Sequence, residues 1–243
     1  MSDPTPTAEA FIAALRANQS DEELRKIARY FKAGPGDYGE GDRFIGVRMG
    51  TVFELAKAHM EMPLGEIEKL LESDIHEARA GAVSIMAKKA AAKRTGEDGR
   101  RELCELYLRR HDRINNWDLV DLGAWNVVGR YLADKPRDVL YELARSDNPW
   151  ERRTAILATL HFVKQGEADD ALALAELLVS DDEDLIHKAV GGVLRSLTGK
   201  HGERVRAFLE RHAPTMPRVM LRYAIEHFPP EERAHFMGLK GGG

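Results

Sequence analysis

The stretch His111–Trp125, HDRINNWDLVDLGAW, is one copy of a helical signature that recurs along the chain and decides the fold. Comparable copies start at Ser73, Ser146 and Ser180, so consecutive starts lie roughly 38, 35 and 34 residues apart. This period is typical of stacked helix-pair repeats. Apolar residues also return at three- and four-residue spacing along most of the chain, without an alternating strand pattern. We therefore predict an all-α protein, a curved solenoid of stacked antiparallel helix pairs with one concave face.

The same periodicity places the individual helices. We expect helices over residues 7–17, 21–33, 50–61, 63–72, 75–93, 99–110, 115–132, 136–145, 149–164, 168–179, 183–198, 201–212, 215–228 and 230–237. Asp74, Asp147 and Asp181 are candidates for capping three of them. We interpret residues 1–243 as a single repeat domain, with a flexible glycine-rich connection near 34–42 and a frayed C-terminal tail.

Composition limits the classes of function. The chain has 243 residues, 43% of them hydrophobic, and a net charge of -4, which neither supports nor excludes a polyanionic partner. Its single cysteine, Cys104, is expected to be a small core residue of a reduced protein. No secretory signal or membrane-spanning run is evident, so we expect a cytoplasmic protein. The histidines form no compact ligand set, so we expect neither a metal nor a cofactor.

One acidic residue interrupts the repeat pattern. Ten residues after each repeat start, the chain has Val83, Asp121, Ile156 and Val190. A buried carboxylate without partners would cost several kcal/mol, so Asp121 requires donors, a charge or a water-filled groove. Trp117 lies four residues earlier, which places its indole beside this carboxylate on one helical face.

Basic residues gather late in one repeat and early in the next, so stacking can align them as a basic stripe. The residues singled out for this stripe are Arg113, Arg152, Lys188 and Arg195. Phosphate contact and ordinary solvated helix surface both explain such residues. Arg153 either pairs with a neighbouring acid or binds a phosphate. His76 and His187, near repeat starts, are expected at the surface or beside a helix cap.

Three blocks, NNWDLVD, SDNPWERRTAIL and IHKAVGGVLR, together resemble the HEAT-like DNA alkylation repair glycosylases of the AlkD type. The resemblance extends across nearly the whole chain. It implies a solenoid whose concave basic face holds duplex DNA, and an activity that removes N3- or N7-alkylated purines. It also implies that Asp121 is the catalytic carboxylate, that Trp117 contacts the deoxyribose of the lesion, and that Arg153 assists at the nearby DNA backbone.

The resemblance has two further consequences. Tyr30 corresponds to another groove-side position. Gly192 stands where the family commonly has a second tryptophan, so one aromatic wall is absent; this departure would weaken excision, enlarge the space for a bulky adduct, or leave a DNA-binding relative with little catalysis.

We therefore expect a monomeric, monofunctional DNA glycosylase that acts on duplex DNA containing cationic alkylpurines and associates with the nucleoid. Two alternatives remain open. Gly192 favours a catalytically weak HEAT-repeat DNA-binding protein, and the acidic net charge favours a protein-interaction scaffold.

Overall fold

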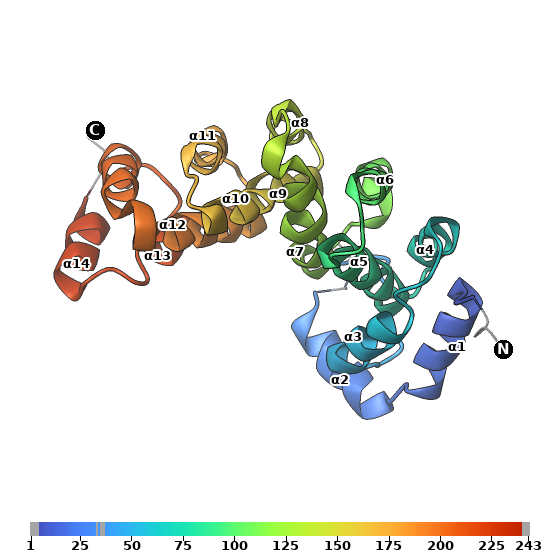
Figure 1. Ribbon diagram of the computed structural model, residues 1–243. Helices are drawn as coiled ribbons and strands as arrows, with labels where there is room; N and C mark the ends of the chain where they lie inside the picture. The colour runs from blue at the N-terminus through green and yellow to red at the C-terminus, as the bar shows by residue number, and fades with distance from the viewer. Residues whose placement is uncertain (1–4, 33, 35–36, 240–243) are drawn as a thin grey trace. The chain divides into compact units, whose positions relative to one another are not determined.

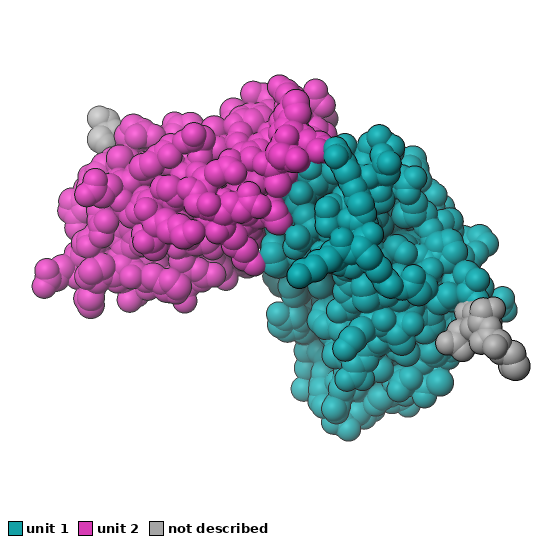
Figure 2. All heavy atoms as spheres, in the orientation of Figure 1, with its two compact units in different colours: residues 1–131 teal, residues 132–243 magenta. Residues whose placement is uncertain are grey.

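The structure is a computed structural model that describes residues 5–32, 34 and 37–239. These residues form helices and connecting loops; among them there is no β-strand, only one isolated bridge between Arg43 and Ile75. The all-α, solenoid-like prediction is therefore confirmed. The helices gather into two compact units, Met1–Tyr131 and Leu132–Gly243 (Figure 2). The single repeat domain, the curvature and the basic face stay predictions.

The first unit is organised around one central helix, α5, which packs against α3, α4, α6 and α7 (Figure 1). Its helices are α1 (Ala8–Ala17), α2 (Asp21–Tyr30), α3 (Met49–Ala58), α4 (Leu64–Leu71), α5 (His76–Ala91), α6 (Glu97–Arg109), the 3-10 turn η1 (His111–Arg113), α7 (Trp117–Gly123) and the π-helix η2 (Ala124–Gly129). Most of α5 is buried, including the polar side chains of its first turn, His76, Glu77 and Arg79.

The second unit repeats this arrangement, because α9 packs against α8, α10, α11 and α12. Its helices are the 3-10 turn η3 (Leu132–Asp134), α8 (Asp138–Leu143), α9 (Pro149–Ala158), α10 (Leu160–Gln165), α11 (Asp169–Leu178), α12 (Asp184–His212), α13 (Arg218–Ala224) and α14 (Pro230–Gly238). Residues expected to form two helices join in α12, which continues through a kink at His201 (φ -127°, ψ 32°).

Two details of the helix ends differ from expectation. The helix expected over 115–132 is α-helical only to Gly123 and then continues as the π-helix. Gly123 allows α7 to approach α6 closely, because a Cβ atom there would lie 2.3 Å from the ring of Tyr107. The capping prediction was wrong for all three aspartates: the N-cap residues of α5, α9 and α12 are Ile75, Asn148 and Glu183.

The remaining expectations have mixed outcomes. Cys104 is buried, as predicted, and burial raises the pKa of its thiol to about 12. Among the described residues, every helix is too short or too polar to cross a bilayer. The glycine-rich segment is described only at Gly34 and 37–42, and its last residue, Asp42, has a side chain that is 2% exposed. Residues 35–36 and the tail at 240–243 lie outside the described residues.

Candidate functional site

Asp121 differs from its counterparts in the other repeats in burial as well as in chemistry. Val83, Ile156 and Val190 are all completely buried in apolar surroundings. Asp121, on α7, is partly exposed and lines a pocket of the first unit. Of the three settings expected for this carboxylate, namely donors, a charge or a groove, the pocket supplies the groove.

The pocket has a volume of about 470 Å³. Its walls come from α2, the segment before α3, α3 itself, α5 and α7. The lining residues are Glu23, Ile27, Tyr30, Phe31, Phe44, Val47, Arg48, Met49, Phe53, His76, Glu77, Trp117, Asp118, Asp121 and Leu122. Three residues selected from the sequence, Tyr30, Trp117 and Asp121, thus meet at one concave site whose surface is mainly apolar.

An aromatic cluster forms one wall of the pocket. The ring of Phe31 stacks on the indole of Trp117, with centroids 5.3 Å apart and planes 16° apart. Tyr30 meets the same indole edge-on at 5.7 Å and is 67% exposed, which is unusual for a large aromatic side chain. Trp117 is therefore held by a buried ring on one side while an exposed ring borders it. Such an arrangement offers π surface to a cationic or planar ligand.

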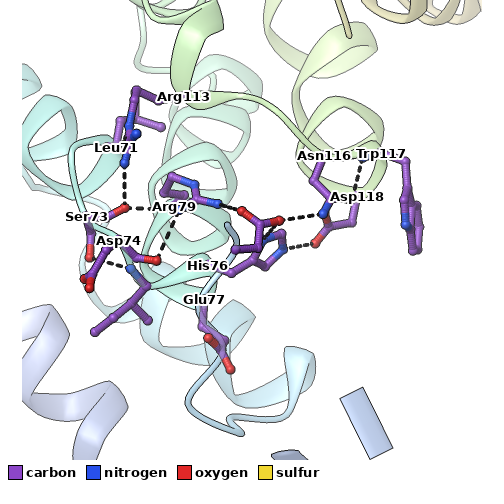
Figure 3. A network of polar contacts seen from close by, with 12 residues as sticks. Leu71, Ser73, Asp74, His76, Glu77, Arg79, Arg113, Asn116, Trp117 and Asp118 are labelled. Carbon is purple, nitrogen blue, oxygen red and sulfur yellow. Dashed lines mark hydrogen bonds and ion pairs between the residues drawn. The ribbon is translucent and has the colours of Figure 1, made fainter. Parts of the chain in front are cut away.

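Behind this wall lies a buried ion network that joins the first turns of α5 and α7 (Figure 3). His76 bridges two carboxylates: Nε2 lies 2.7 Å from Asp118 Oδ2, and Nδ1 lies 3.2 Å from Asp42 Oδ2. Arg79 donates to the other oxygen of Asp42, and Asn116 Nδ2 donates to Oδ2 at 2.7 Å. Asn116 also caps α7, because its Oδ1 accepts the backbone N–H of Trp117 at 2.8 Å.

The charges of this network favour protonated His76. Burial acts to lower the pKa of His76, but the charge and hydrogen bond of Asp118, together with those of Asp42, raise it from 6.5 to about 9. Burial acts to raise the pKa of Asp42, yet its contacts with His76, Asn116 and Arg79 lower it overall. Near neutral pH, two cations, His76 and Arg79, therefore balance two carboxylates, Asp42 and Asp118.

A second buried carboxylate fixes the loop before α3. Glu77 is 1% exposed, and its Oε1 accepts the backbone N–H groups of Ile45, Gly46 and Val47 at 3.1, 2.9 and 3.2 Å. Gly46 has φ +81°, and a Cβ atom there would lie 2.2 Å from the carbonyl oxygen of Ser20. The loop that carries Val47 and Arg48 to the pocket is thus anchored on α5.

Arg113 and Arg152, both expected at phosphates, contact backbone carbonyls instead of lying free on the surface. Arg113 donates to the carbonyls of residues 71, 72 and 73 at 3.0–3.1 Å, at the C-terminal end of α4. Arg152 donates to the carbonyls of residues 146 and 147 and pairs with Asp181 at 2.7 Å. Arg79 makes the equivalent contacts with the carbonyls of residues 73 and 74. These arginines therefore tie together the turns between repeats.

The other expected cations also have partners. Lys188 pairs with Asp184 one turn earlier in α12, at 2.5 Å, and Arg195 pairs with Glu226. Arg153 is only 6% exposed, and its guanidinium donates to the carbonyl of Leu185. These residues belong to the second unit, whereas Trp117 and Asp121 belong to the first.

Gly192 lies on α12, where a Cβ atom would meet nothing within 4 Å. The space directly around a Cβ at this position is therefore open. By contrast, the adjacent Gly191 is packed tightly, because a Cβ atom would lie 2.5 Å from the carbonyl oxygen of Met220.

Sequence reasoning missed the ion network. His76, expected at the surface or beside a cap, does lie directly after Ile75, the N-cap residue of α5, but it is completely buried, so the surface alternative was wrong. Its partners Asp42 and Asp118 lie 34 and 42 residues away in the sequence, and no spacing rule connects them. The signal in the sequence was Asp118 itself, a second acid beside Asp121 in a short helix whose other residues are apolar.

Comparisons with known proteins give consistent results. The family model for DNA alkylation repair enzymes matches residues 11–228. A solved structure described as a predicted DNA alkylation repair enzyme from Enterococcus faecalis superimposes with a TM-score of 0.64 at 16% identity, covering 88% of this chain and 98% of that one. At this identity, the likeness shows a shared fold. No curated protein matches the sequence.

Proposed function

Because this chain belongs to the family of DNA alkylation repair enzymes, we propose that it is a DNA glycosylase that excises N3- or N7-alkylated purines from duplex DNA. The reaction is hydrolysis of the N-glycosidic bond and leaves an abasic site. We place this activity at the pocket of the first unit. The protein would act as a monomer among the DNA of the cytoplasm.

The observation that carries this proposal is the placement of Trp117 and Asp121 on one wall of one pocket. Asp121 occupies a column that the other repeats fill with buried aliphatic side chains. A carboxylate kept at such a position favours a functional role over a packing role. Tyr30, exposed beside Trp117, extends the aromatic surface toward a ligand.

The chemistry needs a carboxylate and little else. Alkylation at N3 or N7 makes the purine a cation, so the base can leave without prior protonation. Positive charge then develops at C1′ of the sugar, and the Asp121 carboxylate stabilises that charge and orients the attacking water. Two opposite charges about 4 Å apart interact by about 4 kcal/mol at an effective dielectric constant of about 20, which corresponds to roughly a thousandfold in rate.

Trp117 supports this step in two ways. The face of its indole attracts the cationic sugar or base, and its bulk keeps water from screening Asp121. The stack on Phe31 fixes the indole plane, so that this attraction needs little reorganisation when DNA binds. Selectivity would then follow from the lability of the cationic base, and the open pocket would tolerate bulky adducts.

We propose that the basic residues bind the DNA backbone. Lys188 and Arg195 pair with partly exposed acids, and such pairs contribute only about 0–1 kcal/mol, so phosphates can replace those partners. Arg153 is held by the carbonyl of Leu185, and its guanidinium would assist at a phosphate near the lesion while keeping that contact. Arg113 and Arg152 would add phosphate contacts while retaining their carbonyl partners.

The test is base release from duplex DNA that contains 7-methylguanine, measured with the wild-type protein and with Asp121→Asn. We expect free 7-methylguanine and abasic sites with the wild type and a loss of about a thousandfold with the variant. Wild-type release no faster than that of Asp121→Asn, with both small and bulky adducts, would reject the proposal.

A second candidate is a DNA-binding protein with little catalysis. It is favoured by Gly192, which leaves open space where the family commonly has an aromatic wall. It predicts salt-sensitive duplex binding without base release. Asp121-dependent turnover would exclude it.

A further inference from the structure

The proposed chemistry does not use the ion network behind the aromatic wall, in which His76 and Asp118 join α5 to α7. We propose that His76 and Asp118 are positioning residues for the proposed glycosylase reaction: their buried ion pair fixes the first turn of α7 and so orients Trp117 and Asp121. This inference rests on the proposed function for its kinetic consequence. Neither residue needs to touch the substrate.

The polar contacts at the start of α7 hold the helix on the side that faces α5. In α7, Trp117, Asp118 and Asp121 all border the pocket, but Asp118 is only 8% exposed and its carboxylate reaches His76 on α5 at 2.7 Å. Asn116, immediately before them, is tied to Asp42 at 2.7 Å. Figure 3 shows the indole of Trp117 projecting away from this network. The first turn of α7 is therefore anchored on its inner side by two polar contacts, which fixes the rotation of the helix about its axis.

His76 also supports the indole of Trp117 through packed aromatic rings. The imidazole of His76 lies 5.3 Å from the ring of Phe31 and 4.5 Å from that of Phe44, measured between centroids. Phe31 in turn stacks on Trp117 at 5.3 Å. His76 therefore supports Trp117 through the backbone, by way of Asp118, and through the rings, by way of Phe31.

The His76–Asp118 pair is present in addition to an arginine contact that holds the equivalent turn in both units. Arg79 already ties the turn before α5 to Asp42, in the same way that Arg152 ties the turn before α9 to Asp181. The repeat that contains Trp117 adds a second buried pair, His76 with Asp118. Removing two more charges from water is unfavourable unless their geometry is well satisfied, and an apolar pair would avoid that penalty. Asp118 Oδ1 even has no hydrogen-bond donor among the described residues. The orientation of α7 explains why a charged pair occupies this place instead of an apolar one.

The test uses single-turnover release of 7-methylguanine by four proteins: the wild type, Asp118→Asn, His76→Gln and a matched control, Asp170→Asn. Asp170 accepts bonds from Arg137 and Tyr141, both at 2.6 Å, in the second unit. We expect both network variants to lose about 100-fold in the rate at saturating DNA, with little change in the DNA concentration for half-saturation. The control should keep the wild-type rate.

The pH profile separates positioning from mere folding. The charged groups facing His76 are Asp42 from the loop and Asp118 from α7. The other charged residues of its pocket are Glu23, Arg48, Glu77 and Asp121. We expect the wild-type rate, corrected for spontaneous release, to fall as pH rises through about 9 while the protein stays folded. His76→Gln should be slow at every pH and lack this fall. Folded variants that retain the wild-type rate and profile would overturn the proposal.

A further measurement does not depend on catalysis. It therefore tests the proposal even if the variants do not fold or the wild type releases no base. In the NMR spectrum of the wild-type protein, the indole N–H resonance of Trp117, assigned with Trp117→Phe, should shift with the same midpoint as the imidazole of His76. An indole resonance that stays constant while His76 titrates would contradict the proposal. Absence of base release would reject the proposed function alone.

Discussion

His76 makes the stability of the first unit depend on pH in a direction that can be worked out. The pKa of His76 is raised from 6.5 to about 9, which corresponds to about 3 kcal/mol of stabilisation at roughly 1.4 kcal/mol per tenfold change in proton affinity. Because the folded state binds the proton more tightly, this contribution is fully present below about pH 6.5. It declines as pH rises and is lost above about pH 9.

The perturbation is His76→Gln, and the assay is urea denaturation of both proteins between about pH 6 and about pH 10, followed by circular dichroism. The wild-type advantage in the free energy of unfolding should be largest near pH 6 and shrink by about 3 kcal/mol toward pH 10. Other titratable groups, including Lys89, whose pKa burial lowers, are common to both proteins and cancel in the difference. Parallel stability curves across this range would refute the reasoning.

Three further predictions concern the surroundings of the pocket. Glu77→Ala should lower the free energy of unfolding by about 3 kcal/mol in urea denaturation, since three backbone N–H groups lose their acceptor; a change below about 1 kcal/mol would contradict the anchoring of this loop. Gly46→Ala should destabilise the protein by at least about 1 kcal/mol, seen as a lower Tm, because φ is +81° and the added Cβ would meet the carbonyl of Ser20; an unchanged Tm would count against it. Gly192→Trp should fold normally, because its Cβ enters open space, and should increase release of 7-methylguanine in a single-turnover assay; a slower rate would argue against a missing aromatic wall.

Much of the architecture was predictable from the sequence because local patterns determine it. Helical periodicity located the helical segments, although the helix expected over 149–164 is divided into α9 and α10. The repeat comparison identified Asp121 as the acid in a column of buried aliphatic residues, as the structure has it. The π-helix after Gly123 and the continuous α12 through His201 were not predictable, because packing overrides local propensity at both positions.

The ion network and the partners of the basic residues were beyond the sequence for a different reason. His76 joins Asp42 and Asp118 only because α5, α7 and the preceding loop meet in space. Likewise, Arg152 looks like an available cation in the sequence, but its side chain holds the carbonyl of Ser146 and pairs with Asp181. Long-range pairing of this kind follows from the stacking of repeats, which the periodicity predicts only in outline.

The account depends most on a single side chain, the carboxylate of Asp121 at the pocket wall. Its most direct test is the single-turnover rate of 7-methylguanine release from duplex DNA by the wild-type protein and by Asp121→Asn at equal DNA occupancy. We predict rapid release by the wild type and a loss of about a thousandfold in the variant, with DNA binding retained. Equal rates in two folded, DNA-bound proteins would contradict the account.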